Sequence, residues 1–497
     1  MLGSPTRHLD PAQTAQLAAD LPLRHSLAHR LCKLCSPTVA ADLALLANAA
    51  VITALALATH LFYYGGFFPT RLRADDYVLI GLAVGLTYFF TARFAFRLDF
   101  EAMTKGLESG WTSAKALLIA ATLFLVAVFL TKTTDSHSRG WFVFWIIGSG
   151  LALVALHVAY ARFFATAIRL PDSPYRHRVA VIGTADLAAA FATHMADVGT
   201  SRTELVHRAA LPEESDDATF RHEIADFIRV CRSQPISEVV VALPWADEAR
   251  LMTAVHALAG LPVDVRLAPD RAGFALADSP YLAGTSLPLV TVSTRPIRDW
   301  GKLVKELFDR VGAAFLLVVL SPVFLAIAIA IKLESKGPVF FLQRRNGFNH
   351  RTFQMWKFRS MVADADKQAT TYRQATRGDP RITRVGAILR KTSLDELPQL
   401  INVVKGEMSL VGPRPHPIAL DDQYMALIDQ YASRHAVLPG MTGWAQVNGY
   451  RGETDTEEKM IGRIAHDLHY IRNWTPTLDV WILALTVVRG FVNKNAY

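Results

Sequence analysis

The sequence has few cysteines, and this scarcity limits the kind of protein it encodes. Three of the 497 residues are cysteines: Cys32, Cys35 and Cys231. So small a number excludes a disulfide-built domain. Cys32 and Cys35 have the spacing of a redox or zinc motif, but no second cysteine pair or histidine cluster completes a zinc site. We therefore attribute that spacing to chance.

Charged residues are also scarce. They make up 19% of the chain, against 51% hydrophobic residues, and the mean hydropathy is +0.23. This composition is too apolar for an ordinary soluble protein and predicts transmembrane segments. The net charge of +8 is not accompanied by a basic and aromatic recognition motif for nucleic acid. We therefore expect no nucleic-acid partner and assign the basic excess to cytoplasmic loops that face anionic lipid.

Long apolar runs follow a polar start. Residues 1–40 contain no short apolar core before a small-residue cleavage site, so we expect a poorly ordered cytoplasmic arm and no cleavable signal peptide. Four apolar runs, each near the length that crosses a bilayer, then occupy about 41–63, 76–96, 112–131 and 141–161. Residues 41–165 are thus predicted to form an α-helical membrane domain of four transmembrane helices.

The loops between these runs predict their orientation. Basic residues gather between the second and third runs and after the fourth: Arg93, Arg97, Lys105, Lys115, Arg162, Arg169, Arg176 and Arg178. The other two loops carry fewer cations. The positive-inside rule therefore places both ends of the four-helix domain in the cytoplasm.

Residues 176–270 have a different pattern, in which short apolar strands alternate with helices. The predicted strands are 179–182, 236–243 and 263–267, and the predicted helices run from Gly183 to about 198 and over about 246–259. This alternation is typical of a parallel, Rossmann-like α/β sheet. Gly183 opens a degenerate dinucleotide fingerprint, because Ala185 and Ala188 occupy the places of further glycines. We therefore expect a module for assembly or regulation rather than an NAD site.

A linker and interfacial segment is predicted at 271–300, and a basic amphipathic stretch, Ile297–Phe308, leads out of it. Such a stretch suits a membrane surface, where Lys302 and Lys305 would attract lipid headgroups. The apolar segment Val311–Ile331 is long enough to span a bilayer, but Ser321 and Pro322 interrupt it. Proline kinks a helix, and basic residues lie on both sides of the segment. We predict a re-entrant helix over 309–333 rather than an ordinary kinked span.

Two adjacent carboxylates, Asp395 and Glu396, lie between basic residues in the C-terminal part of the chain. Arg390 and Lys391 precede them, and Arg414 follows between two prolines. Acids among fixed cations suit phosphate chemistry with a divalent metal, in which one carboxylate binds Mg²⁺ and the other attacks phosphorus. The stretch Ser393–Glu396 also fits a helix capping box, and on local sequence alone that structural interpretation is favoured.

Several spaced motifs between about 300 and 497 resemble the bacterial sugar transferases, the monotopic phosphoglycosyl transferases. The matching pieces are Leu320-Ser-Pro322, Lys357-Phe-Arg359, Thr392-Ser-Leu-Asp-Glu-Leu-Pro-Gln399, Gly412-Pro-Arg-Pro415, Pro439-Gly-Met-Thr-Gly-Trp444 and Asn473-Trp474. The four apolar runs and the degenerate α/β module resemble the large form that primes exopolysaccharide or O-antigen assembly. The resemblance implies an α/β catalytic domain at 301–497 that contains the re-entrant helix.

The resemblance also implies a reaction. A sugar 1-phosphate would pass from a UDP-sugar to undecaprenyl phosphate, with release of UMP and with Mg²⁺ as cofactor. Asp395 matches the nucleophile that forms a covalent phosphosugar intermediate, and Glu396 matches the magnesium ligand. Arg390 and Arg414 match phosphate-binding positions.

Four further residues are assigned to substrate binding. Lys357 and Arg359 form a basic cluster suited to substrate phosphate or, alternatively, to lipid headgroups. Asp467 matches a family acidic position whose role the sequence does not define. Small members of the family carry Asn-Gly-Arg after the glycine-tryptophan turn, whereas Tyr450 here displaces the cation to Arg451.

The expected partners are a UDP-sugar, undecaprenyl phosphate, membrane lipids and a second copy of the chain. We expect a multi-pass protein of the bacterial inner membrane with a cytoplasmic catalytic domain. Glucose is the favoured sugar and galactose the next. Two other functions stay open: a membrane scaffold or nucleotide sensor that tolerates loss of the acidic pair, and a transferase that passes the whole sugar and releases UDP.

Overall fold

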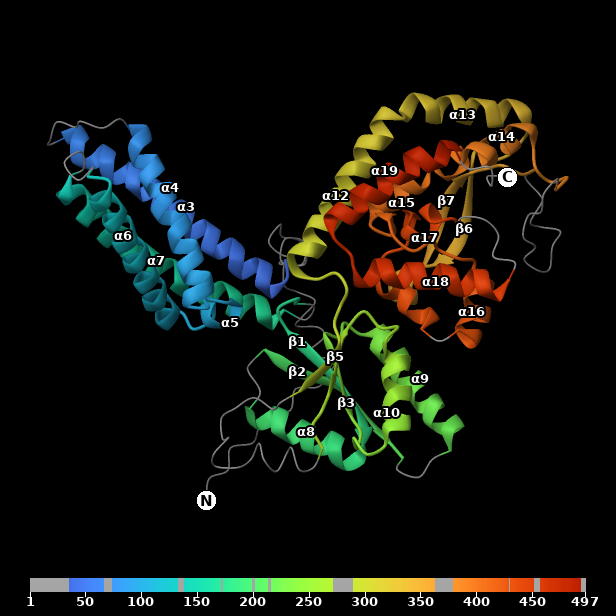
Figure 1. The fold of residues 1–497 in the computed structure, drawn as a ribbon, viewed down its shortest axis with the longest axis horizontal. Helices are drawn as coiled ribbons and strands as arrows, with labels where there is room; N and C mark the ends of the chain where they lie inside the picture. The colour runs from blue at the N-terminus through green and yellow to red at the C-terminus, as the bar shows by residue number, and fades with distance from the viewer. Residues whose placement is uncertain are drawn as a thin grey trace, which may run out of the picture. The chain divides into compact units, whose positions relative to one another are not determined.

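The structure is a computed structural model that describes residues 35–66, 74–132, 138–170, 173–198, 202–212, 216–270, 289–362, 379–428, 430–450 and 456–492. The chain divides after Arg176 into two compact units, which are described separately (Figure 1). Cys32, Arg451 and most of the predicted N-terminal arm and linker lie outside the described residues.

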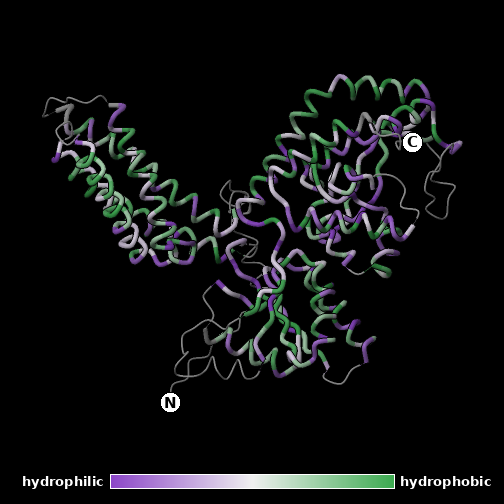
Figure 2. Tube along the Cα trace, viewed as in Figure 1, coloured by the Kyte–Doolittle hydropathy of each residue, from purple (hydrophilic) through white to green (hydrophobic). Residues whose placement is uncertain are grey.

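Four long apolar helices make up most of the N-terminal unit: α3 (Pro37–Gly66), α4 (Ala74–Phe90), α6 (Leu107–Leu130) and α7 (Arg139–Arg169). A π-helical turn extends α4, and the short helix α5 (Phe100–Met103) precedes α6. All four long helices have the length and hydropathy of membrane spans, and Figure 2 shows their hydrophobic character. The four predicted apolar runs are therefore confirmed as helices, and the protein is membrane-associated.

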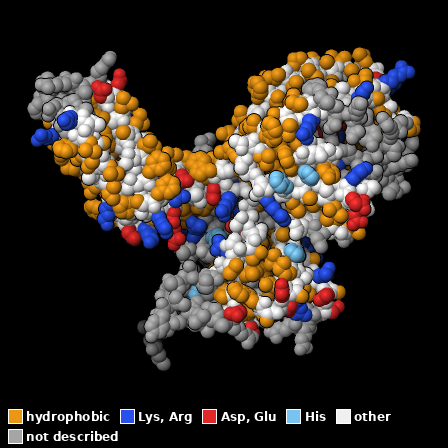
Figure 3. All heavy atoms as spheres, in the orientation of Figure 1, with side chains coloured by type: hydrophobic (Ala, Val, Ile, Leu, Met, Phe, Trp, Pro, Cys, Tyr) orange, Lys and Arg blue, Asp and Glu red, His pale blue; other side chains and the backbone are white. Residues whose placement is uncertain are grey.

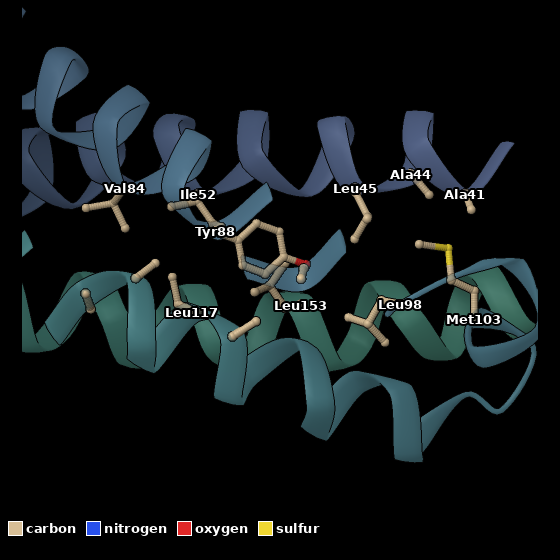
Figure 4. Close-up of a cluster of buried hydrophobic side chains, with 14 of the residues drawn as sticks. Ala41, Ala44, Leu45, Ile52, Val84, Tyr88, Leu98, Met103, Leu117 and Leu153 are labelled. Carbon is tan, nitrogen blue, oxygen red and sulfur yellow. The ribbon is translucent and has the colours of Figure 1, made fainter. Parts of the chain in front are cut away.

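The inner faces of these helices share one apolar core. Ile52, Val84, Leu117 and Leu153 are among its fully buried side chains, and Figure 4 shows them between the helices. The outer faces are also apolar, since Leu86, Phe129 and Leu151 are 57–73% exposed, and Figure 3 shows hydrophobic side chains covering this unit. Helices that are hydrophobic on every side fit a lipid environment, where the outer side chains meet acyl chains.

A buried polar network crosses this core. The amide of Asn48 on α3 lies 3.0 Å from the hydroxyl of Tyr88 on α4 and 3.1 Å from a ring nitrogen of His157 on α7. Tyr88 reaches Ser113 on α6 at 2.6 Å, and His157 reaches Ser109 at 3.0 Å. All four long helices thus contribute a polar group. In a core without water such groups need one another, so the network fixes how the helices pack.

The second unit begins with a five-stranded sheet. The strands are β1 (His177–Thr184), β2 (Thr203–Leu211), β3 (Glu238–Ala242), β4 (Asp264–Leu267) and β5 (Val290–Ser293), in the order β2-β1-β3-β4-β5. The first four pair in parallel, as predicted, and β5 is antiparallel. Three helices accompany them: α8 (Ala185–Val198), α9 (Asp217–Ser233) and α10 (Glu248–Leu258).

The sequence analysis missed β2, β5 and α9. Both strands lie at the edges of the sheet and are largely half-buried or exposed, so neither forms a continuous apolar run. Gly183 has a steric purpose, because a Cβ there would lie 1.9 Å from the carbonyl oxygen of Ala242 on β3. Ala188 is fully buried against the sheet. Packing therefore accounts for Gly183 and Ala188 of the degenerate fingerprint, whereas Ala185 is exposed.

The C-terminal domain begins with two helices, α12 (Asp299–Val319) and α13 (Ser321–Glu334), which meet at a 61° bend. Pro322 lies in the first turn of α13, where its missing N–H breaks no helical hydrogen bond. The interruption predicted at Ser321 and Pro322 is therefore confirmed as a break between two helices, which are joined at Leu320. The expectation that Lys305 attracts lipid headgroups is wrong, because this side chain is buried and ion-paired.

The rest of this domain packs beneath α12 and α13 (Figure 1). Its elements are β6 (Phe340–Asn346), β7 (Thr352–Phe358), α14 (Arg384–Thr392), α15 (Gln399–Lys405), β8 (Ser409–Val411), α16 (Ile418–Leu427), β9 (Gly440–Thr442), α17 (Trp444–Val447), α18 (Glu457–Arg472) and α19 (Pro476–Val492). β6 and β7 form an antiparallel pair, and the parallel pair β8–β9 brings the Gly412 and Gly440 motifs together.

The polar network of the N-terminal unit gives a stability prediction. Asn48→Leu removes the hydrogen bonds to Tyr88, His157 and Tyr160 and leaves their polar atoms buried in an apolar core. We expect the free energy of unfolding in detergent to fall by about 1–2 kcal/mol. Thr122→Val on the exposed side of α6 is the matched control and should change it little. Equal stability of Asn48→Leu and the wild type would contradict a structural role for the network.

Candidate active site

Ser393, which has a left-handed backbone conformation, positions the acidic pair that follows it. Helix α14 ends at Ser393, whose φ is 58° and whose backbone N–H bonds the carbonyl of Arg390. The chain then makes one 3₁₀ turn over Leu394–Glu396 before Pro398 and α15. The predicted capping box is wrong, because an N-cap needs an extended residue and Ser393 makes no side-chain cap to this turn. The acids are thus free of a capping role.

Glu396 accepts hydrogen bonds from two cations. Lys357 on β7 donates to its Oε1 at 2.9 Å. Arg414, which follows β8, donates to Oε1 at 2.6 Å and to Oε2 at 3.1 Å, so this ion pair is bidentate. Burial alone would raise the pKa of Glu396, but Arg414 and Lys357 hold it well below its usual range. The glutamate is therefore ionised and fixed in place.

Asp395 has a different environment. Its side chain is buried, and within the described ranges no hydrogen bond or ion pair engages its carboxylate. Burial and the neighbouring charge of Glu396 raise the pKa of Asp395 to about 6, against the opposing charges of Lys357, Arg390 and Arg414. An unengaged carboxylate whose pKa lies near neutrality, among three cations, has the properties of a nucleophile for a phosphate group.

The other predicted cations divide between the site and the scaffold. Arg390 lies one turn before Asp395, donates to the hydroxyl of Ser360 at 2.9 Å and contributes its charge to the acid pair. Arg359 is not brought to that pair. Its guanidinium donates to the carbonyls of Lys336 and Ser335, both at 2.8 Å, and so holds the end of α13. Arg451 lies outside the described residues.

Asp467 serves a second buried network. Its carboxylate accepts from Arg434 at 2.9 Å, and Arg434 also donates to the backbone carbonyl of Arg414 at 2.7 Å. Burial raises the pKa of Asp467, although Arg434 and Arg463 oppose this. Burial and the same arginines keep the pKa of His416, 2.6 Å from Arg434, well below its usual range, so this ring is neutral. Asp467 thus supports Arg414 through Arg434.

Arg434 is the residue of this site that sequence reasoning missed. It lies in a 3₁₀ segment, Tyr431–Ala436, between two recognisable motifs, and no pattern in the sequence separates it from a surface arginine. Only the fold, which brings this segment under Arg414, reveals its role.

The residues of the acid pair fit a magnesium ion that is held mainly by substrate. Among the residues that the structure describes, no group of three or more histidine, cysteine, aspartate or glutamate side chains gathers as a metal site. The three cation hydrogen bonds leave part of the lone-pair capacity of Glu396 unused, and Asp395 lies beside it. Mg²⁺ typically takes one or two carboxylates and completes its shell with phosphate oxygens and water.

Comparison with known proteins finds relatives that match the region containing these motifs. The bacterial sugar transferase family matches residues 300–493, and a CoA-binding domain family matches 102–269. A UDP-glucose:undecaprenyl-phosphate glucose-1-phosphate transferase of Escherichia coli is 46% identical over 275 residues, which cover 55% of this chain and 59% of that protein.

A transferase of the same name from Xanthomonas campestris is 37% identical over 385 residues, which cover 76% of this chain and 78% of that protein. A UDP-N-acetylgalactosamine-undecaprenyl-phosphate N-acetylgalactosaminephosphotransferase of Aeromonas hydrophila is 44% identical over 185 residues, or 37% of this chain and 43% of that protein. The chain thus spans from under half to more than three quarters of these relatives. Together with the acid pair and its cations, the similarity shows that this protein belongs to the bacterial sugar transferase family.

Proposed function

We propose that this protein transfers glucose 1-phosphate from UDP-glucose to undecaprenyl phosphate and so primes exopolysaccharide synthesis. One observation carries the proposal: the carboxylate of Asp395 is buried and, within the described part of the chain, has no hydrogen bond or ion pair. Lys357 and Arg414 hold the carboxylate of Glu396 beside it. The names of the Escherichia coli and Xanthomonas campestris relatives support the substrates. The relative from Aeromonas hydrophila is named for a different sugar, so the choice of glucose depends on the longer alignments.

In the first step Asp395 acts as the nucleophile. An oxygen of its carboxylate bonds to the sugar-bearing phosphorus of UDP-glucose as the bond from that phosphorus to the bridging oxygen breaks. UMP leaves with the bridging oxygen, and an aspartyl phosphosugar stays on the enzyme. An anion attacks an anion here, so the positive charges of Arg390, Lys357 and Arg414 are needed to offset the repulsion.

In the second step a phosphate oxygen of undecaprenyl phosphate attacks the same phosphorus. The bond to Asp395 breaks, the carboxylate is regenerated and the lipid leaves as undecaprenyl diphosphate glucose. Two successive displacements allow a water-soluble donor and a lipid acceptor to use one site in turn. Glu396, with Asp395 beside it, would hold Mg²⁺, which when bound neutralises charge on the diphosphate oxygens.

The bend at Leu320 supports a re-entrant membrane helix in this proposal. Together, α12 and α13 are long and apolar enough for a bent membrane segment. Apolar side chains such as Phe315, Val318 and Leu325 are exposed on the surface of this helix pair. If both ends lie on the cytoplasmic side, the catalytic domain stays with the soluble donor while its first helices reach the lipid acceptor. We further propose an inner-membrane location with cytoplasmic termini, and a homodimer, as expected for the large form of the family.

Loss of the nucleophile tests the reaction. Asp395→Asn should lower UMP release from UDP-glucose by about 10³-fold or more, since the attacking oxygen is lost. UMP, UDP and labelled lipid are measured by chromatography with the protein in nanodiscs, and Asp422→Asn, an exposed acid on α16, is the control. Turnover that survives Asp395→Asn would favour a scaffold role for the pair, release of UDP would indicate whole-sugar transfer, and faster turnover of UDP-galactose would correct the sugar.

The raised pKa of Asp395 predicts a pH profile. Protonation removes the nucleophile, so UMP release without lipid acceptor should decline as the pH falls through about 6 and level off above it. The acceptor is omitted because a phosphate monoester also titrates near that pH. Lys357→Met removes a charge that lowers the pKa of Asp395, so the decline should move to higher pH. A rate of UMP release that varies by less than about 20% between pH 5 and 8 would exclude this titration of Asp395.

Chemical labelling tests the re-entrant helix. In a variant without its native cysteines, single cysteines replace Lys302, in the first turn of α12, and Lys336, just after the end of α13. Both should react with a membrane-impermeant maleimide from the cytoplasmic side only. Lys132→Cys, at the end of α6, is expected on the opposite side and serves as the control. Labelling of Lys302→Cys and Lys336→Cys from opposite sides would show an ordinary span.

A further inference from the structure

Helix α12 carries a lysine that never reaches the surface. Lys305 is 7% exposed, and its ammonium lies 2.7 Å from Asp479 on α19 and 3.4 Å from Asp309 one turn later on α12. Burying an ammonium and two carboxylates is costly unless each is paired. This buried cluster between α12 and α19 therefore has a role that apolar side chains cannot fill, such as hydrogen bonding to other groups.

The third contact of Lys305 indicates that purpose. Its ammonium donates to the backbone carbonyl of Val411, the last residue of β8, at 3.0 Å. The hydroxyl of Tyr470 lies 2.9 Å from the same carbonyl and 2.8 Å from Asp479. Asp309 accepts from the backbone N–H of Leu410 at 3.2 Å. One end of β8 is thus held directly by side chains of α12 and α18, and Asp479 on α19 joins Lys305 to Tyr470.

The chain after Val411 leads directly to the catalytic arginine. The backbone N–H of Gly412 donates to Thr442 at 2.8 Å, and the carbonyl of Pro413 accepts from Gly440 at 2.9 Å. Arg414 comes next, with two prolines beside it that restrict the backbone. Only Gly412 and Pro413 separate the residue whose carbonyl Lys305 binds from Arg414, whose guanidinium binds Glu396.

We propose that Lys305 is a positioning residue for phosphotransfer: through the Val411 carbonyl it fixes the segment Val411–Pro415, and thereby places Arg414 against Glu396 beside Asp395. The inference builds on the proposed function, because it assigns Arg414 to the substrate phosphates. It makes α12 more than a membrane anchor. The helix that reaches the lipid also sets the geometry of the group that neutralises the phosphate.

The test uses full-length protein in nanodiscs with UDP-glucose and undecaprenyl phosphate. Lys305→Met keeps much of the side-chain length and removes the donor, so Arg414 is no longer aligned. We expect kcat to fall about 10- to 100-fold, with a smaller change in the KM for UDP-glucose. Lys302→Met is the matched control, because Lys302 lies on the same helix with a side chain that is 59% exposed, and it should retain wild-type kcat.

A double-mutant cycle separates positioning from general destabilisation. If Lys305 acts through Arg414, then Lys305→Met added to Arg414→Lys should lower kcat by less than about 3-fold further. Independent losses that multiply, or a kcat of Lys305→Met within about 2-fold of the wild type, would overturn the proposal. If Lys305→Met does not fold, Tyr470→Phe, which removes another side-chain donor to the Val411 carbonyl, carries the same cycle with the same outcomes.

The controls also separate this proposal from the proposed function. A wild-type protein that releases no UMP would refute the function itself. If the wild-type protein releases UMP and Lys305→Met has the same kcat, only the positioning role is refuted.

Discussion

The ion pairs of Glu396 with Lys357 and Arg414 are the constraint on which the candidate site depends. They join β7, the turn after α14 and the segment after β8, which lie far apart in the sequence. Because both cations bind Glu396, no hydrogen bond or ion pair among the described residues engages the adjacent buried carboxylate of Asp395. One carboxylate is thus ion-paired and the other is not, and the two neighbouring acids have different pKa values for that reason.

Buried cations elsewhere in the domain act on the backbone. Lys305 holds the carbonyl of Val411, Arg434 that of Arg414, and Arg359 those of Ser335 and Lys336. The sequence alone suggested lipid headgroups for Lys305 and either substrate phosphate or lipid headgroups for Arg359, and it did not single out Arg434. A buried cation that donates to carbonyl oxygens gives rigidity to a segment with little regular structure. Arg414 lies in such a segment.

The sequence predicted the parts of this protein that have strong local patterns. The four apolar runs became helices, and the acidic pair with Arg390, Arg414 and Lys357 came together as expected. The sequence did not predict the roles of residues whose environment is determined by tertiary contacts. Lys305 sits in an amphipathic pattern that favours a membrane surface, yet α19 covers it. Ser393 matches a cap by residue type, but its left-handed backbone excludes that role. Arg434 has no local signal, since its partners come from other segments.

The proposed mechanism requires a carboxylate that takes the phosphosugar from a soluble donor before any lipid is present. The most direct measurement is peptide mass spectrometry of the protein after incubation with UDP-glucose and Mg²⁺ in the absence of acceptor. A covalent aspartyl intermediate predicts a hexose phosphate on the peptide that contains Asp395, removed by hydroxylamine and by added undecaprenyl phosphate. An active enzyme that never carries this adduct, or carries it on another residue, would exclude Asp395 as the nucleophile.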